Sequence, residues 1–408
     1  MMKPGLLLLT HRIPFPPNKG DKIRSYHLFR FLAKHYQVHL GTFIDDEADW
    51  QHVAFLQEYS SSYKAFGIQP KLAQLKSLQG FVRNEPLSIS YYRHSKMRHW
   101  VRQIMNTRGI MRVMVFSSSM AQFVESYMDR VTTVVDFVDV DSDKWRQYAQ
   151  SKNWPMSAIY RREARLLSAY EKSIAAKSSA SVFVSQAEAR LFQQNSPTVS
   201  HKVHFINNGV DAHYFTPQGY YENPYGPNKK IIVFTGAMDY WANADAVIWF
   251  SHQVMPAIIA RIPNASFYIV GAKPSRAVKQ LHNGDSIHVT GKVADVRPFL
   301  NFAHVVVAPL RIARGIQNKI LEALAMGKAV VSTSAAMEGI TLNENEFNRV
   351  RDQAAEFADA CCNYLQRQDI FRFSAARQFV LEHYLWEKNL EQYLSLLERS
   401  TTTTVSSR

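Results

Sequence analysis

Residues 308 to 339 read APLRIARGIQNKILEALAMGKAVVSTSAAMEG, in which two apolar strands flank a basic loop and a short helix. Lys319 and Glu322 are three residues apart, so they share one face of that helix. Gly327 is placed to end the helix. A helix N-terminus with cations nearby attracts phosphates, and a carboxylate one turn further on can accept hydrogen bonds from sugar hydroxyls. The segment therefore predicts a βαβ unit that binds a phosphorylated ligand.

Two cations of this segment are the expected diphosphate ligands. Arg311 can hold two phosphate oxygens at once, whereas Lys319 acts as a point charge. Glu322 is expected to accept hydrogen bonds from ribose hydroxyls. The alternative is a surface ion pair between Lys319 and Glu322, which contributes well under about 1 kcal/mol. The position of the pair at the start of a helix favours ligand binding.

The strand and helix pattern of this segment repeats along the chain in two series. The first half alternates apolar strands with helices, which are clearest over residues 22–35 and 160–177, while residues 49–108 are expected to be mostly helical. Expected strands are residues 6–10, 38–43, 112–116, 133–137, 181–185 and 203–206, then 231–235, 267–270, 288–290 and 305–308. Two such series predict an α/β fold with two doubly wound, Rossmann-like parallel sheets. Ligands are then expected at the carboxyl ends of the strands, in a cleft between the domains.

The chain length of 408 residues suggests two or more domains. A Gly-, Pro- and Asn-rich segment at residues 220–230 has the composition of a linker. The expected division is a first Rossmann-like domain over residues 1–215, a second Rossmann-like domain over 216–380, a C-terminal helix over 381–400 that packs back on the first domain, and a disordered tail over 401–408.

Cysteine content and hydropathy indicate the compartment. Cys361 and Cys362 are adjacent in sequence, so no disulfide framework is expected and a reducing compartment fits. The apolar run at residues 5–9 is too short for a signal peptide, and no run approaches the length of a membrane span. We expect a cytoplasmic protein, either soluble or peripheral on the inner face of the cell membrane.

The net charge of +14 is concentrated in the first half of the chain. Residues 1–200 hold 27 Lys and Arg against 16 Asp and Glu, and the excess is greatest over residues 64–112, where basic and aromatic side chains alternate. An anionic membrane surface and a solvated basic face are equally consistent with this pattern. A nucleic acid is the third interpretation, and it is not expected because no binding motif accompanies the charge.

A glycine-containing loop follows the first strand of each half. The loop THRIPFPPNKGDKIR contains Gly20, which permits close approach of a ligand, and Asp21, which can cap the next helix. Gly236 follows the strand of residues 231–235 and leaves room for phosphates. Each glycine alone is a weak signal, since many βα loops contain glycine.

The segment VVDFVDVDSDKW, residues 134–145, carries four aspartates at the end of a strand. Asp136 and Asp139 are the candidates for an acid/base or an acceptor contact, while Asp141 and Asp143 are expected to be solvated loop or cap residues. An Asp-x-Asp pair suits Mg²⁺ or Mn²⁺. We expect no metal site, because the chain has two sheets rather than one.

Taken together, these motifs resemble retaining nucleotide-sugar glycosyltransferases of the two-domain GT-B fold, in glycosyltransferase family 4. Residues 206–211 (INNGVD) with Phe215 resemble that family's domain junction, and residues 309–339 resemble its donor signature. The segments RIPFPPNKGDKIRSYHLFRFLA and VDFVDVDSDKW look more narrowly like the sugar transferases associated with PEP-CTERM/exosortase exopolysaccharide systems.

The resemblance implies roles for individual residues. Arg311 and Lys319 take the diphosphate role, Glu322 the ribose role and Gly20 the role of the N-terminal loop. The family often carries a second glutamate eight positions before Glu322, where this chain has Arg314 next to Gly315. Arg314 can supply a charge to the donor from this side, because the basic residues that often follow the first donor-domain strand are absent here.

The resemblance thus implies transfer of a sugar from a nucleoside diphosphate sugar to a hydroxyl of a glycan or lipid-linked acceptor, in exopolysaccharide or cell-surface polysaccharide synthesis. Retention of configuration, metal independence and the absence of any cofactor are implied in the same way. Two alternatives are a nucleotide-sugar epimerase on the same scaffold, and a non-catalytic protein that only binds nucleotide sugar. A dinucleotide oxidoreductase is disfavoured because no G-x-G-x-x-G follows a strand.

Overall fold

The computed structural model describes residues 3–17, 20–313, 315–367 and 372–398. The chain forms two compact units. Unit 1 comprises residues 1–206 and 390–408, and unit 2 comprises residues 207–389. The expected tail at residues 401–408 lies outside the described residues. Within the part of the chain that is described, no helix has the length and apolarity needed to cross a membrane.

Unit 1 is built on a parallel sheet, whose described strands number seven in the order β3-β2-β1-β4-β5-β6-β7. The strands are β1 (Gly5–Thr10), β2 (Gln37–Ile44), β3 (Ser62–Gly67), β4 (Arg112–Phe116), β5 (Thr132–Val138), β6 (Ala180–Phe183) and β7 (Val203–Phe205). The order reverses between β1 and β4, which places the topological switch point at their carboxyl ends.

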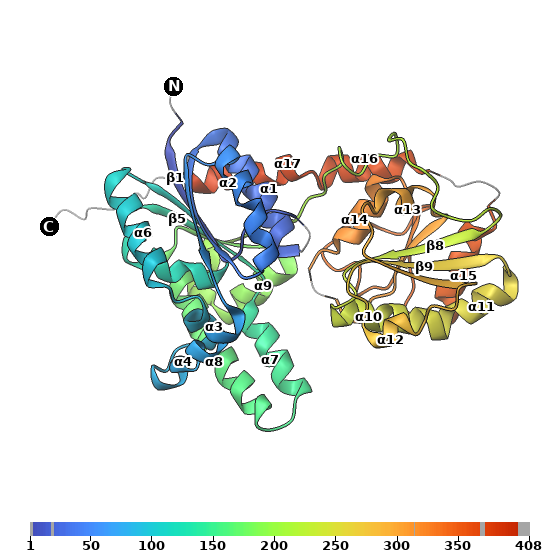
Figure 1. The fold of residues 1–408 in the computed structure, drawn as a ribbon, viewed down its shortest axis with the longest axis horizontal. Helices are drawn as coiled ribbons and strands as arrows, with labels where there is room; N and C mark the ends of the chain where they lie inside the picture. Colours follow the sequence, from blue (N-terminus) through green and yellow to red (C-terminus); the bar gives the residue numbers. More distant parts are fainter. Residues whose placement is uncertain (1–2, 18–19, 314, 368–371, 399–408) are drawn as a thin grey trace. The chain divides into compact units, whose positions relative to one another are not determined.

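Helices cover both faces of this sheet, and Figure 1 shows β1 and β5 between α6 and α1. The helices are α1 (Gly20–His35), α2 (Val53–Tyr59), α3 (Pro70–Ser77), α4 (Gln79–Val82), α5 (Leu87–Tyr91), α6 (Ser95–Thr107), α7 (Asp141–Ser151), α8 (Met156–Lys177) and α9 (Gln186–Asn195). Short 3₁₀ helices are η1 (Glu47–His52), η2 (Ser118–Phe123), η3 (Glu125–Tyr127) and η4 (Pro197–Lys202). Leu7 and Leu9 of β1 pack in one core with Val101 and Ile104 of α6.

Unit 2 repeats this topology with described strands in the order β10-β9-β8-β11-β12-β13, all parallel. The strands are β8 (Lys230–Thr235), β9 (Ala265–Val270), β10 (Ile287–Gly291), β11 (Val305–Ala308), β12 (Val330–Ser332) and β13 (Asn348–Val350). The helices are α10 (Trp241–Trp249), the π-helical turn η5 (Phe250–Val254), α11 (Met255–Arg261), α12 (Arg276–Lys279), α13 (Arg297–Asn301), α14 (Asn318–Ala325), α15 (Ala354–Leu365) and α16 (Ser374–His383). In Figure 1, α13 and α14 lie on one side of β8 and β9, and α10 to α12 on the other. The prediction of two doubly wound parallel sheets is confirmed.

The last helix, α17 (Trp386–Leu397), begins in unit 2 and continues in unit 1. Tyr393, Leu396 and Leu397 are buried. The Tyr393 hydroxyl donates to the Asp136 carboxylate at 2.6 Å and accepts from Arg24 at 2.8 Å. The chain therefore returns to complete the unit in which it began.

The expectation that residues 49–108 are mostly helical needs one correction. Residues 62–67 form β3, which pairs in parallel with β2 from His39–Ser62 to Ile44–Gly67. The side chains of β3 are half-buried or exposed, because it is an edge strand of the sheet. Its sequence, SYKAFG, therefore lacks the continuous apolar run that marks the inner strands.

Candidate functional site

In each unit, the candidate residues lie at the carboxyl ends of the central strands. In unit 2, β8 and β9 each end at a glycine, Gly236 and Gly271, with φ of +157° and +158°. A Cβ on Gly271 would lie 1.7 Å from the Gly236 carbonyl oxygen, and a Cβ on Gly236 would lie 2.7 Å from Asn243 Nδ2. Only glycine fits at both positions, so two backbone segments approach closely at this edge of the sheet.

Lys319, in the first turn of α14, lies against Gly236 of this pair. Its Nζ donates to Asn243 Oδ1 at 2.6 Å and lies 4.1 Å from the centroid of the Phe234 ring. A Cβ on Gly236 would lie 3.3 Å from the same Nζ. Asn243 is itself fixed by donating from Nδ2 to the Ala237 carbonyl at 2.9 Å. The ammonium group is therefore held at the edge of the sheet beside a glycine-lined surface.

Burial moves the pKa values of Lys319 and Glu322 toward each other. Burial lowers the pKa of Lys319 to about 7, and the Glu322 charge opposes that change. Burial raises the pKa of Glu322 to about 7, and the Lys319 charge opposes it. By surface area Lys319 is 9% exposed and Glu322 is half-buried. Two titrating groups with strongly shifted pKa values at one strand edge are typical of a functional site.

Helix α14 ends as the sequence predicts. Gly327 has φ of +69°, its N–H donates to the Leu324 carbonyl, and the Lys328 N–H donates to the Ala323 carbonyl, both at 2.9 Å. This is a Schellman C-cap, and it fixes the length of the helix that carries Lys319.

The other donor-side candidates lie on the loop after β11. Arg311 is exposed, and its guanidinium forms a two-point ion pair with Asp245 of α10, at 3.1 and 2.5 Å. Gly315 is buried with φ of +65°, a conformation that favours glycine. Arg314 lies outside the described residues.

Five buried side-chain polar atoms of unit 2 have no hydrogen-bond partner among the described residues. Two of them are Ser251 Oγ and Asn348 Oδ1, and the other three are Thr235 Oγ1 at the end of β8, Ser332 Oγ at the end of β12, and Asn318 Oδ1 at the start of α14. Buried polar groups are usually paired. Thr235 and Ser332 lie at the carboxyl ends of their strands, and Asn318 begins the helix that carries Lys319.

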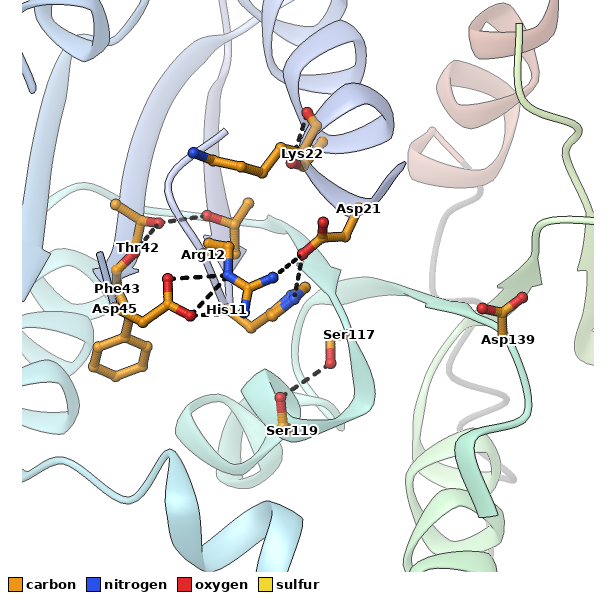
Figure 2. Close-up of polar contacts among 12 residues, drawn as sticks. His11, Arg12, Asp21, Lys22, Thr42, Phe43, Asp45, Ser117, Ser119 and Asp139 are labelled. Carbon is orange, nitrogen blue, oxygen red and sulfur yellow. Dashed lines mark hydrogen bonds and ion pairs between the residues drawn. The ribbon is translucent and has the colours of Figure 1, made fainter. Parts of the chain in front are cut away.

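In unit 1, the loop after β1 carries a network of charged side chains (Figure 2). The Arg12 guanidinium donates to both carboxylate oxygens of Asp45, from Nε at 3.0 Å and from Nη2 at 2.6 Å. It also donates to Asp21 of α1 at 2.6 Å. Burial by itself raises the pKa of Asp21, but hydrogen bonding and the charges of His11 and Arg12 lower that pKa well below its usual range. Arg12 thus ties the end of β1 to the end of β2 and the start of α1.

His11 completes this network. Its Nε2 lies 3.3 Å from Asp21 Oδ2, and its ring stacks on Phe116 of β4 with centroids 5.8 Å apart. Its Nδ1 is buried and has no hydrogen-bond partner among the described residues. Figure 2 shows Ser117 and Ser119 after β4 near the same strand edge. One imidazole nitrogen is therefore oriented by a carboxylate while the other is without a protein partner.

Asp136 and Asp139 differ sharply in their surroundings. Asp136 is fully buried in an ion pair with Arg24 at 2.8 Å, and its other oxygen accepts from the Val138 N–H at 3.0 Å. Asp139 is half-buried and pairs with Lys144 at 2.7 Å. Val138 between them has φ of +68°, a strained conformation for a β-branched residue that is typical of functional sites. Asp143, expected to be solvated, is 4% exposed and ion-paired with Arg146, whereas Asp141 pairs with Lys144 at 3.1 Å.

Gly20 starts α1 and is exposed, and a Cβ there would meet no atom within 4 Å. Its backbone therefore does not require glycine in this structure. The residues that sequence reasoning did not single out are His11, Arg12 and Asp45. Their signal was their position, since each directly follows, or lies next to, the carboxyl end of a buried strand.

Comparison with known proteins agrees with this fold. Residues 229–367 match the family model for glycosyl transferases group 1, whereas no curated protein matches the chain. The structure of sucrose-phosphate synthase from Thermosynechococcus elongatus superposes with a TM-score of 0.69, at 16% identity, over 97% of this chain and 98% of that one. Anabaena HepE, solved with UDP and glucose, gives 0.64 at 16% identity over 97% and 99%.

WaaG, a glycosyltransferase involved in lipopolysaccharide biosynthesis, gives a TM-score of 0.65 at 14% identity over 97% of this chain and 100% of that one. At these identities the neighbours show the fold, and the GT-B prediction is confirmed. The glycosyltransferase domain in unit 2 and these neighbours support the prediction that the protein is a glycosyltransferase.

Proposed function

We propose that the protein transfers a sugar from a nucleoside diphosphate sugar to a hydroxyl of a glycan or lipid-linked acceptor, in the synthesis of exopolysaccharide or another cell-surface polysaccharide. The observation that carries the proposal is the buried ammonium group of Lys319 beside the close-packed Gly236 and Gly271. A small-residue surface with a cation at a helix start suits a diphosphate. HepE, whose structure is also known in complex with UDP-glucose, shares the fold.

The donor side supplies charge where the leaving diphosphate becomes more negative. Lys319 and the N-terminus of α14 would stabilise that charge, and Arg311 would join them by exchanging Asp245 for phosphate oxygens. Glu322 would accept hydrogen bonds from ribose hydroxyls. These protein cations take the role that a metal ion fills elsewhere, so transfer would be metal-independent and would need no cofactor. Retention of configuration rests on the family 4 resemblance.

The acceptor side would be the strand edge of unit 1. Asp139 has an accessible carboxylate and is the candidate acid/base or acceptor contact, while the burial of Asp136 with Arg24 favours a structural role for Asp136. His11, with its free Nδ1 and its Asp21 partner, is a second group that could bind an acceptor hydroxyl. The partners are a donor, an acceptor and an anionic membrane surface. A peripheral position on the cytoplasmic face of the membrane fits a lipid-linked acceptor.

The test is donor binding by matched lysine variants. Lys319→Ala removes a buried charged donor and should weaken binding of the tightest ligand, from a panel of UDP, GDP, ADP and dTDP sugars, by roughly 30-fold, or about 2 kcal/mol. Glu322→Ala should weaken it by a similar factor. Calorimetric titration measures both constants.

Lys328→Ala is the control, because Lys328 is also a buried lysine of unit 2, donates to the Ala303 carbonyl and lies before the amino end of β12, away from the carboxyl ends of the strands. Equal binding by the Lys319→Ala and Lys328→Ala proteins would refute the site. Conversion of the donor to an epimer without acceptor would indicate an epimerase, and binding without turnover over a panel of glycan and lipid-linked acceptors would indicate a non-catalytic protein.

A further inference from the structure

Unit 1 exposes a row of apolar side chains on α3 and α4. Val82 of α4 is 90% exposed and Leu75 of α3 is 65% exposed. Both helices precede α6 in the chain. This surface, called the apolar tip below, comprises Leu72, Leu75, Leu78, Phe81 and Val82. Contiguous exposed apolar surfaces of this kind commonly mark interaction sites.

The apolar tip is held in place by polar contacts from α8. The Arg162 guanidinium donates to the Gly80 carbonyl at 2.7 Å and lies 4.6 Å from the centroid of the Phe81 ring. Glu163, which is 1% exposed, accepts from the N–H groups of Leu87 and Ser88 at 2.7 and 2.8 Å. A buried carboxylate and an arginine thus fix the start of α5 and α4, which carries Phe81 and Val82 of the tip.

A pocket with a basic lining adjoins the apolar tip. It has a volume of about 440 Å³, and its lining, Arg83, Arg93, His94, Arg98, His99 and Arg102 with Ser95, includes no acidic residue among those described. Arg83 directly follows Val82, which joins the pocket to the tip. Arg93 is ion-paired with Glu85, while Arg98 and Arg102 are exposed on one face of α6, four residues apart. Below, this is called the basic pocket.

We propose that the apolar tip and the basic pocket together dock unit 1 on an anionic lipid bilayer, with the tip inserted among the acyl chains and a lipid phosphate in the pocket. Aliphatic side chains next to arginines match a bilayer, which is apolar below and anionic above. A nucleic acid would instead favour stacking on aromatic side chains, and four of the five side chains of the tip are aliphatic. The inference deepens the membrane partner proposed above but does not depend on sugar transfer.

The experiment measures co-sedimentation of the full chain with vesicles of phosphatidylcholine alone and of phosphatidylcholine with phosphatidylglycerol. Wild-type protein should bind the anionic vesicles and lose affinity as salt is added. Each basic residue near an anionic surface contributes roughly a factor of five, so Arg98→Ser with Arg102→Ser should weaken binding about 30-fold. Leu75→Ser with Val82→Ser removes insertion and should weaken it at least about tenfold.

Two control proteins carry the same changes elsewhere on the surface. Arg276→Ser with Lys279→Ser removes two charges from exposed positions of α12, and Met111→Ser with Tyr220→Ser removes exposed apolar side chains. Both should bind like wild type, and circular dichroism melting confirms that all four variants fold. Because no activity is read, failure here would leave the glycosyltransferase proposal intact.

Each of the following results would overturn the proposal. Equal binding to both vesicle types, or no binding to either, removes the anionic bilayer as the partner. Equal loss in the control and test variants removes the surface as the site. RNA binding that is lost in the Arg98→Ser, Arg102→Ser protein, or self-association that is lost in the Leu75→Ser, Val82→Ser protein, identifies a nucleic acid or a second copy as the occupant instead.

Discussion

At the scale of single residues, Lys319 titrates near neutrality because it is buried, and this has a consequence for ligand binding. With a pKa of about 7, a growing fraction of the free protein carries an uncharged Lys319 as pH rises above 7. A bound diphosphate favours the charged form, so binding above pH 7 requires uptake of a proton. Affinity for the donor therefore falls as pH rises.

We expect donor affinity to fall by up to tenfold per pH unit between about pH 7.5 and 9, as measured by calorimetric titration with a nucleotide sugar whose diphosphate does not ionise further in this range. Lys319→Arg keeps a charge that does not titrate there and should flatten the profile, even if its longer side chain weakens binding overall. A wild-type profile as flat as that of Lys319→Arg would contradict the assigned role of Lys319.

Asp139 and Asp136 allow a second test at this scale. Asp139→Asn breaks only a half-exposed ion pair with Lys144 and should cost less than about 1 kcal/mol of stability, while kcat/KM falls and donor affinity stays unchanged. Asp136→Asn leaves the Arg24 charge buried without its partner and should lower the free energy of unfolding by about 3 to 5 kcal/mol. Urea denaturation and initial rates separate the two effects, and full transfer activity in Asp139→Asn would remove it from the site.

Local sequence predicts only some of these residues. Lys319 and Glu322 could be found because they are close in sequence and lie on a helix with a recognisable start and a glycine stop. Arg311 was expected to bind the diphosphate, but its ion pair with Asp245, 66 residues earlier in the chain, was not foreseen. An ion pair of this kind depends on the order of the strands in the sheet. The pattern of apolar and polar residues along the chain does not determine that order.

At the scale of elements, the inner strands of both sheets were predictable, and so were the edge strands β7 and β10, whereas the edge strands β3 and β13 were not. β1, β4, β8 and β11 are buried on both faces, so their sequences are continuous apolar runs. β3 and β13 lie at sheet edges, and β13 is only three residues long. An edge strand forms because its neighbour offers unpaired hydrogen-bonding groups, so its signal resides in the partner strand more than in its own residues.

At the scale of the whole molecule, the end of the chain belongs to the unit that begins it. From Leu390 onward α17 is part of unit 1, where the Tyr393 hydroxyl closes a buried network with Arg24 and Asp136. Arg24 also donates to the Ile206 carbonyl at 2.8 Å, the last residue of unit 1 before the chain enters unit 2. One arginine of α1 therefore binds the points where the chain leaves unit 1 and returns to it.

This network predicts that unit 1, rather than unit 2, depends on the part of α17 from Leu390 onward. Tyr393→Ala removes a buried aromatic ring and the hydroxyl that shares Asp136, and should lower the stability of unit 1 by about 3 to 5 kcal/mol. Hydrogen exchange read by peptide should show faster exchange over β1, β5 and α1, while β8, β11 and α14 keep their protection and donor affinity is unchanged. Glu398 directly follows α17 and forms an exposed ion pair with Arg112. Glu398→Gln should therefore change the free energy of exchange in unit 1 by less than about 1 kcal/mol. Equal loss of protection in both units would mean that they unfold as one body and that α17 supports both.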